Sequence, residues 1–286
     1  MPRLPYRLTV PDVAASALVV SSPHSGRLYE EAFLRASVLD AQRIRSSEDA
    51  YVDVLLSRVP SLGVPLLAAE MPRAMIDLNR APEELDPAVI RDVPRGGAAN
   101  PRISSGLGVI PRVVAQGRAI YGGKISREEA VRRIEQIWRP YHGALEQLLS
   151  RAEARFGQSF LLDVHSMPHD AIEGAAAPGR TPEIVLGDRY GASAAPALVD
   201  AAEAIFAGLG FRVSRNVPFA GAYIVQAYGR PARGRHALQV EIDRAIYLDE
   251  ARVSPNAQFD AVRDRLTAAI AQLSELVAGS ARMAAE

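Results

Sequence analysis

The sequence predicts an α/β fold with a largely parallel or mixed sheet. Short apolar runs that end at turn residues recur along the chain and are typical of buried strands. Segments with helical periodicity alternate with these runs, and each such helix must bury its apolar face against the strands. The chain has 286 residues, of which 48% are hydrophobic and 23% charged, so it can bury a sizeable core.

The expected strands share an apolar run of a few residues bounded by turn residues. They cover residues 17–21, 64–69, 74–78, 160–164, 183–186, 222–226 and 237–242. The clearest predicted helix begins at Ser126, where Ser-Arg-Glu-Glu provides a capping box through Glu129, and runs towards Gly157. Pro140 inside this helix predicts a break or a kink, because proline has no N–H to donate. Two further helices are predicted over residues 194–208 and about 258–277.

We expect residues 1–286 to form a single domain with an irregular, lid-like insertion at about 81–118. Prolines and glycines interrupt every periodic pattern in this insertion, and long irregular stretches in compact domains usually serve as lids or binding loops. A surface insertion without a role is the alternative. The small-residue-rich loop at 169–181 is a second candidate to cover a site.

Composition excludes several classes of function. The chain carries 33 basic and 33 acidic residues, so it lacks the net charge typical of a partner for nucleic acid or for an anionic membrane. It contains no cysteine, which excludes disulfides, thiolate zinc sites, iron–sulfur clusters and a cysteine nucleophile. We expect a cytoplasmic protein, because no signal-like or membrane-spanning apolar segment is present. Oligomeric state cannot be read from the pattern.

Two histidines occupy matching positions and suggest a metal site. His24 and His165 each follow a predicted strand, and in an open α/β sheet the carboxyl ends of strands form the ligand crevice. Either histidine alone is more commonly a structural residue. A hydrolytic zinc ion often takes two histidines and one carboxylate and keeps one position for water. Glu48, Asp49 and Asp53 are candidates for that carboxylate, and the pattern does not choose among them.

The predicted strand at 237–242 carries a candidate general base. Alternation places Leu238 and Val240 on one face and Gln239 and Glu241 on the other. A carboxylate on a central strand is costly unless it is paired or has a chemical role, so Glu241 is a candidate to accept a proton beside a metal. A solvated face of an edge strand is the alternative.

Other polar residues suggest a carboxylate-binding site. Arg73, Asn79 and Arg80 lie close together in one run, and an arginine beside an amide can hold a carboxylate through paired hydrogen bonds. Surface decoration is the competing interpretation in this arginine-rich chain. Tyr223 and Arg230 lie near a turn further along and are additional binding candidates.

Two other functional classes are possible from the residues alone. A serine hydrolase could use Ser25 or Ser166 with a histidine, although the chain has no Gly-x-Ser-x-Gly elbow. A non-catalytic binding protein could keep the same pocket without a metal.

In combination, the motifs resemble the N-formylglutamate amidohydrolase family. The strings SSPHSGR, SSEDAYVD, PRAMIDLNR, IYGGKIS, WRPYH, LLDVHS, FAGAYI, YGRP and HALQVEID occur in the order of that family, over about residues 16–250. The family is similar in outline to zinc carboxypeptidases and to the aspartoacylase and succinylglutamate desuccinylase enzymes. The resemblance therefore implies a three-layer α/β/α fold around a mixed, largely parallel sheet.

The resemblance also implies roles for individual residues. One Zn²⁺ per chain, or another divalent metal, would be bound by His24, Asp49 and His165. The acidic ligand differs from the His-x-x-Glu of carboxypeptidases, because Arg27 stands at that position. Glu241 matches the general base. The other expected roles are polarisation of the scissile carbonyl by Arg73, binding of the substrate α-carboxylate by Asn79 and Arg80, and further substrate contacts by Tyr223 and Arg230.

The expected reaction is hydrolysis of the N-acyl amide of an acidic amino acid. The simplest case converts N-formyl-L-glutamate and water to formate and L-glutamate, a step that the resemblance associates with histidine degradation. Another N-acyl amino acid or a short peptide is the alternative substrate, because similar zinc sites cleave several acyl groups.

Overall fold

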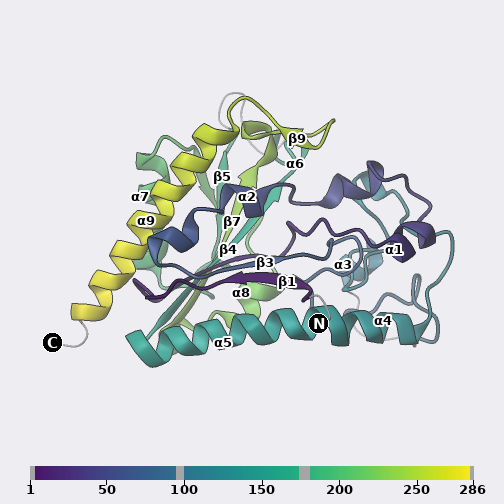
Figure 1. Ribbon diagram of the computed structural model, residues 1–286, viewed down its shortest axis with the longest axis horizontal. Helices are drawn as coiled ribbons and strands as arrows, with labels where there is room; N and C mark the ends of the chain where they lie inside the picture. Colours follow the sequence, from purple (N-terminus) through teal and green to yellow (C-terminus); the bar gives the residue numbers. More distant parts are fainter. Residues whose placement is uncertain (1–3, 95–99, 174–180, 284–286) are drawn as a thin grey trace. The chain divides into compact units, whose positions relative to one another are not determined.

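The computed structural model describes residues 4–94, 100–173 and 181–283 (Figure 1). The predicted insertion at 81–118 and the predicted loop at 169–181 therefore lie partly outside the described residues, at 95–99 and 174–180.

A mixed sheet forms the centre of the fold. Over the described residues it has seven strands in the order β1-β3-β2-β4-β7-β5-β6. Strands β2, β4 and β7 are parallel neighbours, β5 pairs with β7 in the antiparallel sense, and β6 is parallel to β5. The strands are β1 (Tyr6–Thr9), β2 (Leu18–Ser22), β3 (Leu66–Ala69), β4 (Ser159–Met167), β5 (Ile184–Gly187), β6 (Val213–Arg215) and β7 (Arg235–Asp243), with a separate pair β8 (Leu248–Asp249) and β9 (Ser254–Pro255).

Helices alternate with the strands along the chain. The α-helices are α1 (Glu31–Ala36), α2 (Val52–Leu55), α3 (Pro101–Ser104), α4 (Arg127–Arg133), α5 (Arg139–Phe156), α6 (Asp170–Glu173), α7 (Pro196–Gly208), α8 (Tyr223–Tyr228) and α9 (Phe259–Met283). Short 3-10 helices cover Arg43–Ser47, Val59–Leu62, Ala115–Gly117, Pro231–Arg233 and Arg244–Ile246, and a π-helix, η4, covers Ile134–Trp138. No helix among these residues is both long and apolar enough to cross a membrane.

The backbone contacts divide the chain into two compact units. The first comprises Met1–Arg7, Pro23–Ala50 and Ala68–Ala144, and the second comprises Leu8–Ser22, Tyr51–Leu67 and Leu145–Glu286. In the second unit, α7 and α9 pack against each other and against β5 and β2, whereas α8 packs against β4 and β7 from the other side (Figure 1). This arrangement is the α/β fold that the sequence predicts. The single-domain organisation stays a prediction.

Five of the predicted strands are confirmed, and two are wrong. The run at 74–78 is irregular, because its amide groups bond to a turn and to a loop: Met75 N–H donates to Pro72, and Asp77 N–H donates to Val109. The run at 222–226 lies in helix α8. Its buried residues Ile224, Val225 and Tyr228 share one helical face, and a short apolar run does not distinguish that face from a strand.

The long predicted helix begins as expected but continues past its proline. The Ser126 hydroxyl accepts a hydrogen bond from Glu129 N–H and so caps α4. Instead of a break at Pro140, the chain makes one π-helical stretch, in which Arg139 N–H donates to the carbonyl of Ile134, five residues earlier. Proline cannot donate to the carbonyl four residues earlier, and a π turn accommodates this loss without ending the helix.

Candidate metal centre and its surroundings

The parallel pair β4–β7 places His165 beside Glu241. The two residues are partners in the strand register, and partners in neighbouring strands project from the same face of the sheet. His165 is 2% exposed and Glu241 is 8% exposed. The polar face predicted for β7 is therefore part of the protein interior, next to a histidine.

Asp163 orients the His165 ring. Asp163 lies two residues before His165 on the same face of β4, and its carboxylate accepts a hydrogen bond from His165 Nε2 at 2.9 Å. Its other oxygen accepts one from the Ser21 hydroxyl at 2.5 Å. The bond to Asp163 uses Nε2, so Nδ1 is the nitrogen through which His165 can bind a metal.

Gln239 fixes the Glu241 side chain. The Gln239 amide donates to Glu241 Oε1 at 2.8 Å, and its oxygen accepts from the N–H of Ala222 at 3.1 Å. This chain of bonds links the carboxylate to the start of α8. A carboxylate held in this way loses little conformational entropy when it acts on a substrate.

The turn after β2 holds His24 against a neighbouring segment. Leu28 N–H donates to the carbonyl of Glu70, and a Cβ added to Gly26 would lie 2.1 Å from the carbonyl oxygen of Met71. Only glycine permits this close backbone approach. The Ser-Pro-His-Ser-Gly motif thus has a steric reason for its glycine, and the turn positions His24 near residues 70–80.

His24 has an aspartate near each of its two ring nitrogens. Its Nε2 lies 2.7 Å from Asp77 Oδ1, and its Nδ1 lies 3.5 Å from Asp49 Oδ2. Burial acts to raise the pKa of the Asp77 carboxyl, but His24 and the guanidinium of Arg73 outweigh it and hold that pKa well below its usual range. Asp77 therefore stays ionised and keeps the ring oriented, as a carboxylate behind a metal-binding histidine does.

The structure distinguishes among the three candidate carboxylates. Glu48 accepts two hydrogen bonds from Arg45, at 2.9 and 3.0 Å, and Asp53 lies in the first turn of α2. Asp49 faces His24 instead, and its own N–H donates to the His24 carbonyl at 3.0 Å. Asp49 is thus the acid that this turn brings to the imidazole.

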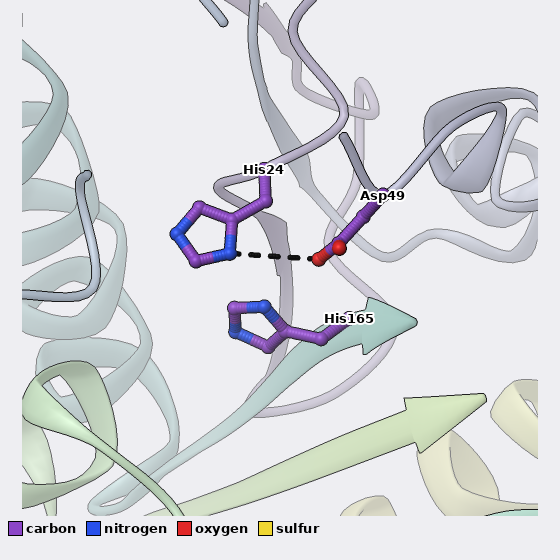
Figure 2. Close-up of side chains that lie close together, drawn as sticks. All are labelled: His24, Asp49 and His165. Atoms are coloured by element: carbon purple, nitrogen blue, oxygen red, sulfur yellow. Dashed lines mark ion pairs between the residues drawn. The ribbon is translucent and has the colours of Figure 1, made fainter. Parts of the chain in front are cut away.

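His24, Asp49 and His165 together form a group that could hold a metal ion. Each offers one ligand atom, these atoms lie within 4.8 Å of one another, and all three residues are buried. Figure 2 shows both rings and the carboxylate directed toward a common point. Two imidazoles and a carboxylate, with an aspartate behind each ring, fit the ligand preference and the outer-shell support of a hydrolytic zinc site.

Arg73 lies beside the ligand group. Its Nη2 is 2.9 Å from Asp77 and its Nη1 is 3.9 Å from Asp49 Oδ1, while its side chain is 23% exposed. The guanidinium therefore adds positive charge next to two buried carboxylates and still reaches solvent.

Arg80 and Asn79 are buried in the irregular segment that carries Asp77. Asn79 N–H donates to Asp77 Oδ1 at 2.8 Å. Arg80 donates from Nε to the Leu107 carbonyl at 2.9 Å and from Nη1 to the Asn79 carbonyl at 2.7 Å, and burial lowers the pKa of its guanidinium. The bond to Leu107 ties the predicted insertion to this segment. Its role as a lid stays a prediction.

Tyr223 and Arg230 lie at the two ends of α8. Tyr223 is the first residue of the helix and is half-buried. Arg230 is exposed, and its Nη1 donates to the carbonyls of Gln226 and Gly229 at the C-terminal end of the helix. Arg230 thus has backbone partners at the end of α8, and its binding role stays a prediction.

Ser166 has a partner other than a histidine. Its hydroxyl accepts a hydrogen bond from Arg244 Nε at 3.1 Å, and alternation along β4 directs it to the face opposite His165.

The sequence analysis does not identify Asp163 and Gln239 as residues that support the site. The signal was available, because each lies two residues before a candidate site residue on a strand.

Comparison with known proteins identifies the family of this chain. A family model for N-formylglutamate amidohydrolase matches residues 16–248. The chain belongs to the N-formylglutamate amidohydrolase family. Membership makes it an amidohydrolase, an enzyme that hydrolyses the C–N bond of an amide.

Relatives and solved structures support the same assignment. The N-formylglutamate deformylases of Pseudomonas putida and Pseudomonas aeruginosa are each 32% identical over 240 residues, which is 82% of this chain and 82% of theirs. The crystal structure of N-formylglutamate amidohydrolase from Ralstonia eutropha JMP134 has 37% identity and a TM-score of 0.89, and the match covers 96% of this chain and 99% of that one. A structure from Agrobacterium tumefaciens, with 15% identity and a TM-score of 0.66, shares the fold.

Proposed function

We propose that this chain is a zinc-dependent hydrolase that converts N-formyl-L-glutamate and water to formate and L-glutamate. The buried His24–Asp49–His165 group in a member of this family is the observation that carries the proposal. The names of the Pseudomonas relatives support the choice of substrate.

His24, Asp49 and His165 would hold the zinc ion. When bound, zinc supplies a Lewis acid for the carbonyl oxygen and lowers the pKa of water toward about 7. Asp77 and Asp163 hold the two rings through Nε2, so Nδ1 of each ring would be the ligand atom. This support matters because a freely rotating imidazole would pay an entropy cost on binding.

Glu241 moves the proton in this reaction. It accepts a proton from the water that attacks the formyl carbon, and it donates that proton to the amide nitrogen as the C–N bond breaks. Formate and the free amine of glutamate are then the two products. The bond from Gln239 keeps the Glu241 carboxylate in place, and this carboxylate is the group that we assign to the proton.

Three cationic or amide groups orient the substrate. Arg73, which is partly exposed next to Asp49, is the candidate to stabilise the negative charge that develops on the formyl oxygen. Arg80 uses Nε and Nη1 on backbone carbonyls, so its guanidinium is held rigidly, and we assign its second amino group and Asn79 to the α-carboxylate. Tyr223 and Arg230 remain candidates for the side-chain carboxylate.

Formate release and metal content together test this proposal. The purified protein should contain about one zinc per chain, release formate from N-formyl-L-glutamate, lose this activity with a chelator and regain it with added zinc. Zinc without formate release would overturn the substrate and direct the search to other N-acyl amino acids or short peptides. A metal-free, inactive protein would favour a binding homologue, and chelator-resistant turnover would favour a metal-free hydrolase.

A further inference from the structure

We propose that Arg133, Trp138 and His142 are positioning residues that set the geometry of the irregular segment 75–80. This inference rests on the proposed function, because the segment carries Asp77, Asn79 and Arg80. The three side chains come from the continuous helical stretch α4–η4–α5. They act on the reaction through the segment and do not touch the substrate.

Each of the three side chains reaches one backbone carbonyl of the segment. The hydrogen bonds run from Arg133 Nη1 to Met75 at 3.0 Å, from His142 Nε2 to Leu78 at 2.9 Å and from Trp138 Nε1 to Arg80 at 3.0 Å. Because a carbonyl can only accept, the bond to Leu78 requires the His142 proton on Nε2.

These bonds replace the partners that a strand would supply. The sequence of the segment predicts a strand, yet the segment is irregular and buried, so its carbonyls need other donors. Along the segment, the carbonyls that accept these bonds lie before, between and after Asp77 and Asn79. A shift of the backbone at any of them would move the group that orients His24 or the group assigned to the substrate.

The π-helical stretch explains how one helix delivers these donors. Arg133 and Trp138 are five residues apart, a spacing that puts two side chains on different faces of an α-helix. A π turn contains one more residue, so it brings positions five apart close to the same face. Trp138 and His142 are then one α-helical turn apart and stack with 3.8 Å between ring centroids.

The three donors are themselves buried, and Arg133 is held by further hydrogen bonds. Arg133 is 3% exposed, Trp138 is 7% exposed and His142 is 5% exposed. Arg133 also bonds to Glu129 at 2.7 Å and to the Tyr121 hydroxyl at 2.6 Å, so its guanidinium cannot follow a displaced carbonyl. Buried donors on a long helix favour a positioning role, because a displacement of about 1 Å in a binding group can cost about 100-fold in rate.

Paired variants at His142 and Trp138 test the inference. His142→Leu removes the donor, whereas His142→Gln can place an amide N–H near the position of Nε2. Trp138→Phe keeps an aromatic ring and removes its N–H. We expect His142→Leu and Trp138→Phe to lower kcat/KM by about 10- to 100-fold. For Trp138→Phe the change should lie mainly in KM. His142→Gln should keep a kcat/KM within about threefold of wild type. All three should retain one zinc per chain.

Leu145→Ala controls for stability. Leu145 is fully buried on α5 and donates nothing to the segment, so its truncation should lower the melting temperature and leave the kinetic constants of the folded enzyme unchanged. If His142→Leu and Trp138→Phe behave like Leu145→Ala, the positioning role is refuted. A His142→Gln variant as impaired as His142→Leu would refute the hydrogen bond as its cause.

A binding readout separates this inference from the proposed function. Trp138 is the only tryptophan, so its fluorescence reports on the segment directly. A change in Trp138 emission on addition of L-glutamate would show that the wild type binds this product. If the wild type binds L-glutamate but releases no formate, the proposed reaction fails. The positioning role still stands in that case if His142→Leu weakens L-glutamate binding at least tenfold and His142→Gln does not. Equal affinity for L-glutamate in wild type and His142→Leu would overturn the positioning role.

Discussion

Replacement of Asp163 by asparagine should weaken zinc binding about tenfold without unfolding the protein. Asp163 is fully buried and bonds to both Ser21 and His165 Nε2. Asparagine preserves the volume of the side chain and one acceptor oxygen. The substitution removes the negative charge of Asp163. That charge holds the His165 proton on Nε2 and makes Nδ1 more basic.

The magnitude follows from the kind of hydrogen bond that is lost. A bond to a charged acceptor contributes about 1.5–3 kcal/mol and a neutral bond about 0.5–1.5 kcal/mol, so the change costs about 1–1.5 kcal/mol of metal-binding free energy. This difference corresponds to an increase of about tenfold in the dissociation constant for zinc. It agrees with the range of about 10- to 100-fold known for outer-shell partners of metal ligands.

Competition with a chromophoric chelator measures this constant directly. Asp86→Asn is the matched control, because Asp86 is also a buried aspartate, with Arg112 as its partner at 3.0 Å. The control should lower the melting temperature and leave zinc affinity unchanged. A folded Asp163→Asn protein whose zinc affinity lies within twofold of wild type would show that Asp163 does not support the ligand.

Three further changes have distinct expected outcomes. Glu241→Gln should still bind one zinc per chain but lose at least about 100-fold in kcat, and near-normal turnover would remove Glu241 as the proton acceptor. Gly26→Ala should lower the free energy of unfolding, measured by urea denaturation, by about 1–3 kcal/mol, because the new Cβ would lie 2.1 Å from a backbone carbonyl oxygen. Gly123→Ala is the control, because its Cβ would meet nothing within 4 Å. Equal stability of the two variants would contradict this packing. The hydrogen bond to Asp243 raises the pKa of His169, so this contact stabilises the fold below about pH 6.5 and is lost as the pH rises through the raised value. His169→Gln should therefore destabilise the protein at about pH 5.5 and have little effect at about pH 9, and an equal loss at both would refute the ionic contribution.

The pattern of the sequence was sufficient for much of the sheet and for the positions of the two histidines. Five predicted strands are present, and His24 follows the end of β2 as expected. His165 lies within β4, near its end, because that strand continues to Met167. Such strands are recognisable because burial on both faces requires a continuous apolar run. Strand alternation likewise put Glu241 on a polar face, and β4 supplies the partner on that face.

The pattern was insufficient where tertiary contacts override local preference. Residues 74–78 have a strand-like composition, but their carbonyls accept bonds from side chains of a helix that begins about 50 residues later. The run at 222–226 is equally apolar and becomes helix α8, because its buried face follows the helical period. In the first run the deciding partners are distant in the chain, whereas the second run is too short for its apolar pattern to distinguish a helix from a strand.

For the candidate metal centre, too, local sequence predicts some features and only the tertiary structure determines the others. Residue type and position along the strands were enough to nominate two imidazoles, a nearby acid and a base, because those properties are local. Selection of Asp49 over Glu48 required the Arg45 contact, and recognition of Asp77 as the partner of His24 required the folded turn. These decisions depend on distances between groups that the chain separates, and only the tertiary structure determines such distances.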